Sequence, residues 1–357
     1  MISTHTKSSA VPDRDPVVVL AADDNFAMGL AATVRSALDN LAADRKLRLF
    51  VLDGGLTSAT KERLLRSWPE GRYEMTWIRV DAQALAGLPV FGHISVVAYY
   101  RILIPRVLPS EVERVIYLDS DLIVRTDLGR LWDCALGGRW CLAAQDCAAP
   151  YLDASQALEN FHLCGRHLGS AQPVSNYREL GLRPEAAYFN SGVLVIDLGA
   201  WRDADLPRQL LACLEEHRQH VRWWDQYALN VVLSGRWGPL DLRWNQGSHV
   251  FVYPSWRQSP FDRQTYEQLR SDPYIVHFTT GSKPWSPPCR HPLRGDFFEY
   301  LDRTAWAGWR PSRLKRLKVM FELLKSQERR LRHGRKWLGD RARQWFERGS
   351  EQSTSGR

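Results

Sequence analysis

Two aspartates, Asp119 and Asp121, stand two positions apart directly after an apolar segment, Arg114–Leu118. In extended backbone, side chains at positions i and i+2 point to the same side, so both carboxylates can share one cation. Mg²⁺ or Mn²⁺ bound by a few protein groups typically keeps positions for substrate phosphates. The same pair also occurs in solvated turns that bind nothing, but the apolar segment before it favours a metal site.

A histidine and a basic loop late in the chain suit the same metal. His277 follows the apolar sequence Tyr-Ile-Val, and imidazole binds Mn²⁺ as well as zinc. A lone histidine in such a setting is more often a core residue. The loop after it, however, contains Gly281, which lets backbone approach a phosphate closely, and Lys283, which adds positive charge. A metal ligand, a glycine loop and a lysine together suit a diphosphate leaving group.

Other polar residues at the ends of predicted elements allow more than one interpretation. Asp23 and Asn25, at the end of the first apolar segment, could bind a base or ribose, or cap the following helix. Asp225 and Gln226 open a predicted helix, where an acidic residue is an ordinary partner of the helix dipole. Taken alone, two further residues are most simply a turn residue and a surface residue: Asn190 and Arg101.

Alternating strands and helices predict an α/β fold that holds these residues at one edge of a sheet. Val17–Asp23 is a continuous apolar run, typical of a strand buried on both faces, and the helix after it, capped by Asp24 or Asn25, carries apolar residues at every fourth position. This β-α-β order predicts a parallel sheet with helices on both faces, which binds ligands at the carboxyl ends of its strands. The further predicted strands are Arg48–Leu52, Thr76–Val80, Arg114–Leu118, Trp140–Ala144, Asn190–Leu198 and Tyr274–Phe278. The further predicted helices are Ser58–Trp68, Ser95–Leu103, Asp203–His217 and Trp224–Leu233.

The positive charge is confined to the C-terminal segment. The 357 residues carry a net charge of +8, and residues 310–348 hold 14 Lys and Arg against 4 Asp and Glu, a local net of +10. The rest of the chain therefore has a net charge near −2, which argues against a nucleic-acid-binding surface on the main domain. Residues 306–357 predict a basic amphipathic helical tail that attaches to an anionic membrane surface. A solvated helix or a partner-binding segment is the alternative.

The composition and the N-terminal sequence also predict the cellular location of the protein. Apolar residues at 44% and charged residues at 25% are typical of a packed globular core. The six cysteines form no Cys-x-x-Cys pair, residues 1–15 are polar and predicted to be disordered, and no apolar run approaches the length of a membrane span. We therefore expect a cytoplasmic protein with free thiols, peripheral on the inner face of the cell membrane.

Together, six segments resemble glycosyltransferase family 8, which includes bacterial lipopolysaccharide galactosyl- and glucosyltransferases and, more distantly, glycogenin. They occur in the order found in that family and span roughly residues 17–286. The segments are Leu20–Asn25, Tyr100-Arg101, Tyr117–Val124, Phe189–Leu198, Asp225-Gln226 and His277–Trp285. The resemblance implies a GT-A fold, a Rossmann-like α/β nucleotide-sugar fold with a mostly parallel sheet, over residues 16–305. It also implies a UDP-hexose donor and Mn²⁺ or Mg²⁺.

The resemblance further implies roles for individual residues. The metal ligands would be Asp119, Asp121 and His277. Uridine would lie against Ala21, Asp23 and Asn25, and the diphosphate against Gly281 and Lys283. The donor sugar would be surrounded by Arg101, Asn190, Asp225 and Gln226. Asp146 falls where the family often has a sugar-side or acceptor-side carboxylate, and the loop-rich insertion 147–187 is expected to help form the acceptor pocket.

The activity implied is retaining transfer of galactose or glucose from a UDP-sugar to a glycan or lipid-linked saccharide, in lipopolysaccharide or other cell-surface glycan synthesis. Gln226 is a poor nucleophile, so front-face attack, in which the leaving phosphate accepts the acceptor's proton, is plausible, with Asp225 as the alternative nucleophile. The rival hypotheses are a UDP-sugar-binding protein without turnover, a transferase that acts on a protein acceptor, and a nucleic-acid-binding protein suggested by the isoelectric point of 9.3.

Overall fold

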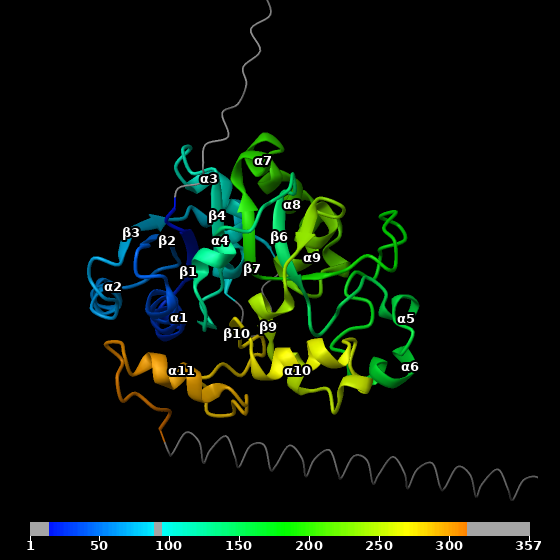
Figure 1. Cartoon of the computed structure of the whole chain (residues 1–357). Coiled ribbons are helices and arrows are strands. Elements are labelled where there is room, and N and C mark those ends of the chain that lie inside the picture. The colour runs from blue at the N-terminus through cyan, green and yellow to red at the C-terminus, as the bar shows by residue number, and fades with distance from the viewer. Residues whose placement is uncertain (1–13, 89–94, 313–357) are drawn as a thin grey trace, which may run out of the picture. The chain divides into compact units, whose positions relative to one another are not determined.

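The structure is a computed structural model that describes residues 14–88 and 95–312. Its centre is a seven-stranded sheet, which Figure 1 shows between the helices. In spatial order the strands are β3 (Tyr73–Arg79), β2 (Leu47–Asp53), β1 (Val17–Ala22), β4 (Arg114–Leu118), β7 (Phe189–Asp197), β6 (Cys141–Gln145) and β8 (Trp237–Pro239).

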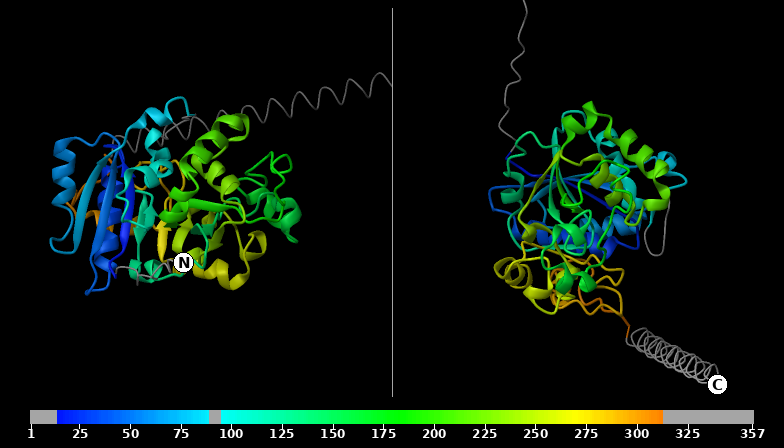
Figure 2. Two further views of the ribbon diagram at one scale, coloured as in Figure 1. Left: turned by 90° about the horizontal axis from the view of Figure 1, so that it is seen from above. Right: turned by 90° about the vertical axis from the view of Figure 1, so that its right-hand side faces the viewer.

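The sheet is mostly parallel, as the sequence predicts. β1 pairs in parallel with β2 and β4, and every residue of β1 is buried, which agrees with its continuous apolar sequence. Only β7 among the described strands of this sheet runs against its neighbours, since it is antiparallel to both β4 and β6. In the view from above (Figure 2, left), the blue strands lie at one end and the green insertion 147–187 at the other.

A second sheet of three short strands, which the sequence did not predict as a sheet, brings the late histidine to the aspartate pair. It consists of β5 (Leu122–Val124), β10 (Ile275–His277) and β9 (Gln246–Gly247). β10 runs antiparallel to β5 with His277 opposite Leu122, and the Phe278 N–H donates to the Asp121 carbonyl at 3.1 Å. This register fixes His277 beside Asp121 although 156 positions separate them in the sequence.

Helices cover the sheet and extend to its carboxyl edge. α1 (Ala27–Asn40) packs against β5 and α11 (Arg294–Leu301), while α8 (Leu206–Glu216) packs against α9 (Trp224–Val232), which lies on β7. Figure 1 shows α10 (Arg263–Ser271) and α11 along its lower side. The remaining α-helices of the described residues are α2 (Ser58–Leu65), α3 (Ile104–Val107), α4 (Leu128–Trp132), α5 (Ala154–Ala157), α6 (Phe161–Cys164) and α7 (Leu198–Asp203).

Three local predictions are wrong in detail. Neither Asp24 nor Asn25 caps α1; instead Asp23 Oδ1 accepts from the backbone N–H groups of Asn25 and Phe26 at 3.0 and 3.2 Å. The expected helix 95–103 is a 3₁₀ helix, Val96–Leu103, capped by Ser95. The expected helix 203–217 is α8, which begins only at Leu206, because Asp205 before it adopts a left-handed φ of 42°.

The ends of the chain are described only in part. Residues 1–13 and 313–357 lie outside the described residues, and with them most of the predicted disordered N-terminus and most of the basic tail. Trp306, at the expected start of that tail, is buried, and the Arg63 guanidinium lies 4.3 Å from the centre of its ring. Within residues 14–88 and 95–312, no helix combines the length and apolar character that crossing a membrane requires.

Candidate active site

A cavity of about 350 Å³ opens at the carboxyl ends of β1 and β4. This is the edge where open α/β sheets bind ligands. The cavity is lined by all but two of the site residues that the sequence predicts. The predicted residues in its lining are Ala21, Asp23, Arg101, Asp119, Asp121, Asp146, Asn190, Asp225, Gln226, His277 and Lys283. The two others, Asn25 and Gly281, are exposed and lie outside the lining.

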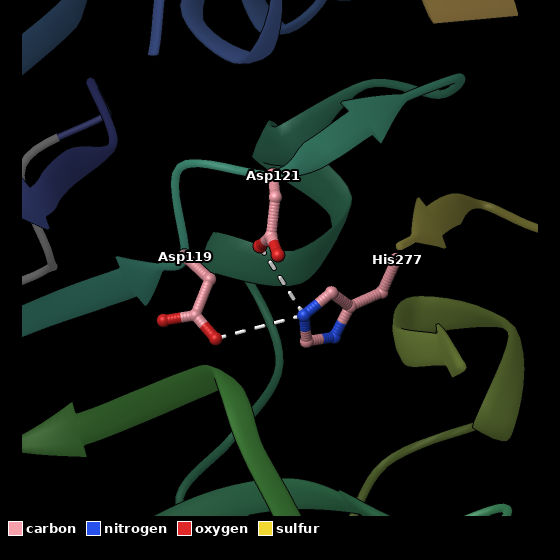
Figure 3. Close-up of side chains that lie close together, drawn as sticks. All are labelled: Asp119, Asp121 and His277. Atoms are coloured by element: carbon pink, nitrogen blue, oxygen red, sulfur yellow. Dashed lines mark ion pairs between the residues drawn. The ribbon is translucent and has the colours of Figure 1, made fainter. Parts of the chain in front are cut away.

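Asp119, Asp121 and His277 converge on one point. Each offers one ligand atom, and these atoms lie within 4.8 Å of one another. His277 Nε2 is 3.6 Å from Asp119 Oδ2 and 3.4 Å from Asp121 Oδ1, and Figure 3 shows both carboxylates pointing toward that nitrogen. Two carboxylates and an imidazole are a donor set that suits Mn²⁺. The residues present therefore fit a divalent cation.

The surroundings of Asp119 leave one of its oxygens for a ligand. Its Oδ1 accepts from Arg101 Nη2 and from the Tyr117 hydroxyl, both at 2.9 Å. Its Oδ2 faces His277 Nε2. Gly192 is needed beside this pair, because a Cβ atom on it would enter the space between His277 and Asp119. Hydrogen bonds to Oδ1 therefore hold the Asp119 carboxylate in place, and Oδ2 is left to contact a ligand beside His277.

Asp121 is held by the lysine of the late loop. Lys283 Nζ donates to Asp121 Oδ2 and, at 2.8 Å, to the carbonyl of Phe278. Burial alone would raise the pKa of the Asp121 carboxyl, but the charge and hydrogen bond of Lys283 hold that pKa well below its ordinary value. Lys283 thus lies beside the cluster of Asp119, Asp121 and His277, where its charge balances the buried Asp121 carboxylate.

Arg101 is buried between two carboxylates and is not the surface residue that its type alone suggests. Its Nε lies 2.9 Å from Asp225 Oδ2 and its guanidinium lies 4.5 Å from the centre of the Tyr117 ring. Together with the hydrogen bond to Asp119, these contacts link the cluster of Asp119, Asp121 and His277 to α9. Burial raises the pKa of the Asp225 carboxyl to about 6; the charge of Arg101 lowers it and that of Asp119 raises it.

Amide side chains connect the other residues expected around a donor sugar. Asp146 Oδ2 accepts from Asn190 Nδ2 at 2.9 Å and from Gln226 Nε2 at 3.0 Å. Asp146 Oδ1 accepts from the backbone N–H groups of Ala148 and Ala149. Four donors of the protein therefore occupy this carboxylate, which lies where the insertion 147–187 begins.

At the expected uridine end, the first strand contributes backbone as well as side chains. The Ala21 carbonyl accepts from Ser120 Oγ at 2.7 Å, which ties β1 to the turn between the two aspartates. The Asp23 carboxylate is partly engaged by the turn after β1, because its Oδ1 accepts two backbone N–H groups. Ala21 and Asp23 both line the cavity, and their contact with uridine stays a prediction.

Some residues of the site have no pattern that would reveal them in the sequence. Asn245 Oδ1 lies 2.8 Å from His277 Nδ1, although Asn245 precedes a two-residue strand that carries no periodic signal. Gly192 falls inside the predicted strand 190–198, now β7, but strand prediction does not indicate that its missing side chain makes room for His277 and Asp119. Trp223 and Trp224 also line the cavity. In the sequence, only their position directly before Asp225 indicates that they belong to the site.

Comparisons with known proteins agree with this geometry. The model of glycosyl transferase family 8 matches residues 17–288. General stress protein A of Bacillus subtilis strain 168 is 31% identical over 292 residues, which cover 81% of this chain and 94% of that protein. The lipopolysaccharide 1,2-glucosyltransferase of Escherichia coli K12 is 21% identical over 291 residues, which cover 81% of this chain and 78% of that protein.

A solved structure extends the likeness to the fold. The crystal structure of galactosyltransferase LgtC in complex with donor and acceptor sugar analogues superposes with a TM-score of 0.66 at 25% identity, and the match covers 81% of this chain and 96% of that one. The fold and the site together define a GT-A glycosyltransferase. The chain belongs to glycosyl transferase family 8, which confirms the resemblance found in the six sequence segments.

Proposed function

We propose that this protein is a retaining hexosyltransferase that moves galactose or glucose from a UDP-sugar to a glycan or lipid-linked saccharide. The observation that carries the proposal is the convergence of Asp119, Asp121 and His277 in one cavity wall at the carboxyl edge of the sheet. Asp23, after β1, and Gln226, in α9, line the same cavity as this cluster. We therefore infer that one cavity holds the nucleotide, the metal-bound diphosphate and the sugar of the donor.

The chain's own residues supply binding and orientation. Asp119 through Oδ2, Asp121 through Oδ1 and His277 through Nε2 would hold Mn²⁺ or Mg²⁺, with Arg101 and Tyr117 fixing Asp119 from behind. When bound there, the cation stabilises negative charge on a diphosphate leaving group. Lys283 adds a second positive charge to the same region. Gly281, exposed in the same loop, would let backbone approach the phosphates.

Front-face attack is the course of reaction that the geometry favours. Asp225, the alternative nucleophile, is buried and paired with Arg101 at 2.9 Å, so its carboxylate is not free to attack a sugar. Gln226 is oriented by the Ser191 N–H, which lies 3.1 Å from its Oε1, and by Asp146. Its remaining amide hydrogen would contact the sugar. Arg101 and Asn190 complete the wall around that position.

The acceptor and the location of the enzyme rest on other features. Ala148 and Gly169 of the insertion 147–187 line the cavity, which supports an acceptor pocket formed by this insertion. A relative is a lipopolysaccharide glucosyltransferase, and the C-terminal segment carries a net charge of +10. We propose that this segment attaches the enzyme to the anionic inner face of the cell membrane, where a lipid-linked acceptor in lipopolysaccharide or other surface-glycan synthesis would be present.

Turnover tests the proposal against a UDP-sugar-binding protein without activity. The purified protein is incubated with Mn²⁺ and a panel of UDP-sugars, and UDP release is measured without acceptor and with saccharide or protein acceptors. We expect release from UDP-galactose or UDP-glucose, and a loss of more than about tenfold in Asp119→Ala and Asp121→Ala. Asp272→Ala, which removes an exposed aspartate outside the cavity, is the control. Wild-type turnover in both cavity variants would refute the metal assignment.

The membrane proposal has its own test. Lys315, Arg316 and Lys318 are replaced together by glutamine in the full chain, and flotation with vesicles is compared between anionic and neutral lipid. The wild type should float with anionic vesicles and lose this binding as salt is raised, and the variant should bind more weakly. Equal flotation of the two proteins would rule out attachment through this basic segment.

A further inference from the structure

A row of side-chain amides connects His277, the imidazole of the metal cluster, to the carboxylate of Asp146. Asn245 Oδ1 lies 2.8 Å from His277 Nδ1, and Asn245 Nδ2 lies 2.9 Å from Asn190 Oδ1. Asn190 Nδ2 in turn donates to Asp146 Oδ2 at 2.9 Å. Asn245 is 1% exposed and His277 4%, so bulk water does not compete for these bonds.

The direction of every bond in this row follows from groups whose chemistry is fixed. The Gly192 N–H lies 3.0 Å from one amide atom of Asn190, which must therefore be the oxygen. The other amide atom of Asn190 faces the Asp146 carboxylate, an acceptor, and must be the nitrogen. Asn245 then has to present its nitrogen to the Asn190 oxygen and its own oxygen to His277. An oxygen in that position requires a proton on His277 Nδ1.

The tautomer of His277 decides whether the cluster can bind a cation. With the proton on Nδ1, the lone pair lies on Nε2, the atom that faces Asp119 Oδ2 and Asp121 Oδ1. With the proton on Nε2, the ring would instead donate to the carboxylates and close the site. Metal-bound histidines generally donate their other ring N–H to a fixed acceptor for this reason.

We propose that Asn245 is a positioning residue for metal binding, which selects the His277 tautomer and, through Asn190, ties the imidazole to Asp146 on the sugar side. The inference rests on the proposed function, because it takes His277 as a metal ligand. Backbone pairing supports the role, since Gln246 and Gly247, the residues after Asn245, pair with Val276 and His277. The asparagine and the histidine are thus held in register by neighbouring strands.

Two substitutions separate selection of the tautomer from packing. Asn245→Leu keeps a similar volume but removes the acceptor, and we expect the Mn²⁺ dissociation constant from isothermal titration calorimetry to rise about 10–100-fold. Asn245→Asp still accepts the Nδ1 proton but cannot donate to Asn190, and it should restore most of the affinity. Asn176→Leu is the matched control, because Asn176 is 2% exposed and accepts a hydrogen bond from Tyr227 outside the cavity lining.

A spectroscopic measurement on the wild type decides the matter even if the leucine variant fails to fold. ¹⁵N NMR of the histidine-labelled full chain at pH 8, with His277→Gln for assignment, should show the His277 proton on Nδ1. A proton on Nε2, wild-type Mn²⁺ affinity in folded Asn245→Leu, or equal loss in the leucine and aspartate variants would overturn the role of Asn245 alone. Absence of Mn²⁺ binding by the wild type would overturn the proposed function as well.

Discussion

Gly192 lies directly against His277, so close that a Cβ atom on the glycine would stand 2.3 Å from the imidazole Cε1 and 2.8 Å from Asp119 Oδ2. Neither neighbour is a free side-chain end. His277 is hydrogen-bonded to Asn245, and Asp119 accepts hydrogen bonds from Arg101 and Tyr117. Strand β7 thus has a glycine where the side chains of Asp119 and His277 come close to its backbone.

Replacing this glycine should damage the metal cluster specifically. In Gly192→Ala the methyl group must displace His277 or Asp119, so we expect UDP release to fall more than about tenfold and Mn²⁺ affinity to fall with it. Gly295→Ala is the control, because a Cβ at that helical position meets no atom within 4 Å apart from the adjacent residues and the backbone of its own helix. Mn²⁺ titration of both variants gives the comparison, and unchanged affinity in Gly192→Ala would contradict the close packing described here.

Lys283 should compete with the metal when no nucleotide is present. Its Nζ donates to Asp121 Oδ2, so a cation that binds Asp121 has to replace part of that interaction. We expect Lys283→Met to bind Mn²⁺ alone severalfold more tightly, but to bind UDP with Mn²⁺ about tenfold more weakly, since a charged donor to the diphosphate is lost. Calorimetric titration measures both constants.

A control for this lysine effect comes from another paired lysine. Lys61 forms an ion pair with Asp53, and neither residue is part of the cavity lining. Lys61→Met should leave both the Mn²⁺ and the UDP constants at their wild-type values. If Lys283→Met weakened Mn²⁺ binding in the absence of nucleotide, the proposed competition between lysine and metal would be wrong.

Asp225 should make stability depend on pH in a defined direction. Burial raises the pKa of its carboxyl to about 6, whereas in the unfolded chain it ionises near pH 4. Its stabilising contribution is therefore fully present below about pH 4 and is lost as the pH rises through about 6. We take the free energy of unfolding of Asp225→Asn and subtract that of the wild type. This difference should increase by on the order of 2 kcal/mol from pH 4.5 to pH 7.5, because only the wild type loses the contribution of Asp225.

Urea unfolding at several pH values measures this difference. Asp272→Asn, at an exposed position, provides the baseline for a substitution of the same kind. At each pH, the free energy of unfolding of the wild type is subtracted from that of the variant. The pH dependence of this difference reports on Asp225, because groups that ionise alike in both proteins cancel. A difference for Asp225→Asn that stays constant from pH 4.5 to pH 7.5 would show that this carboxyl ionises normally in the folded protein.

Much of the fold could be predicted because its strands carry strong local signals. The apolar segments that became β1 and β4 needed no long-range information, and the site residues next to them, Asp23 and Asp119, could be placed at the carboxyl edge from strand geometry alone. The reversed direction of β7 could not be predicted. An apolar strand reads the same whether it runs parallel or antiparallel, and only pairing with β4 and β6 fixes its direction.

The residues that complete the site depend on contacts distant in sequence. Arg101 in isolation resembles a surface arginine, but it is buried because Asp119 and Asp225 surround it. Asn245 is a single polar residue before a two-residue strand, and its importance follows only from the pairing of β9 with β10 beside His277. Short strands and single amides lack periodicity, so pattern analysis has nothing to detect there.

The most direct test of the central claim is the affinity for UDP with and without the metal. Calorimetric titration of UDP into the full chain, once with Mn²⁺ and once with EDTA, compares the wild type with Asp121→Ala and His277→Ala. We predict that EDTA weakens UDP binding to the wild type by at least about tenfold, and that neither variant responds to Mn²⁺. UDP binding that is the same with Mn²⁺ and with EDTA, or a full Mn²⁺ response in both variants, would contradict the account.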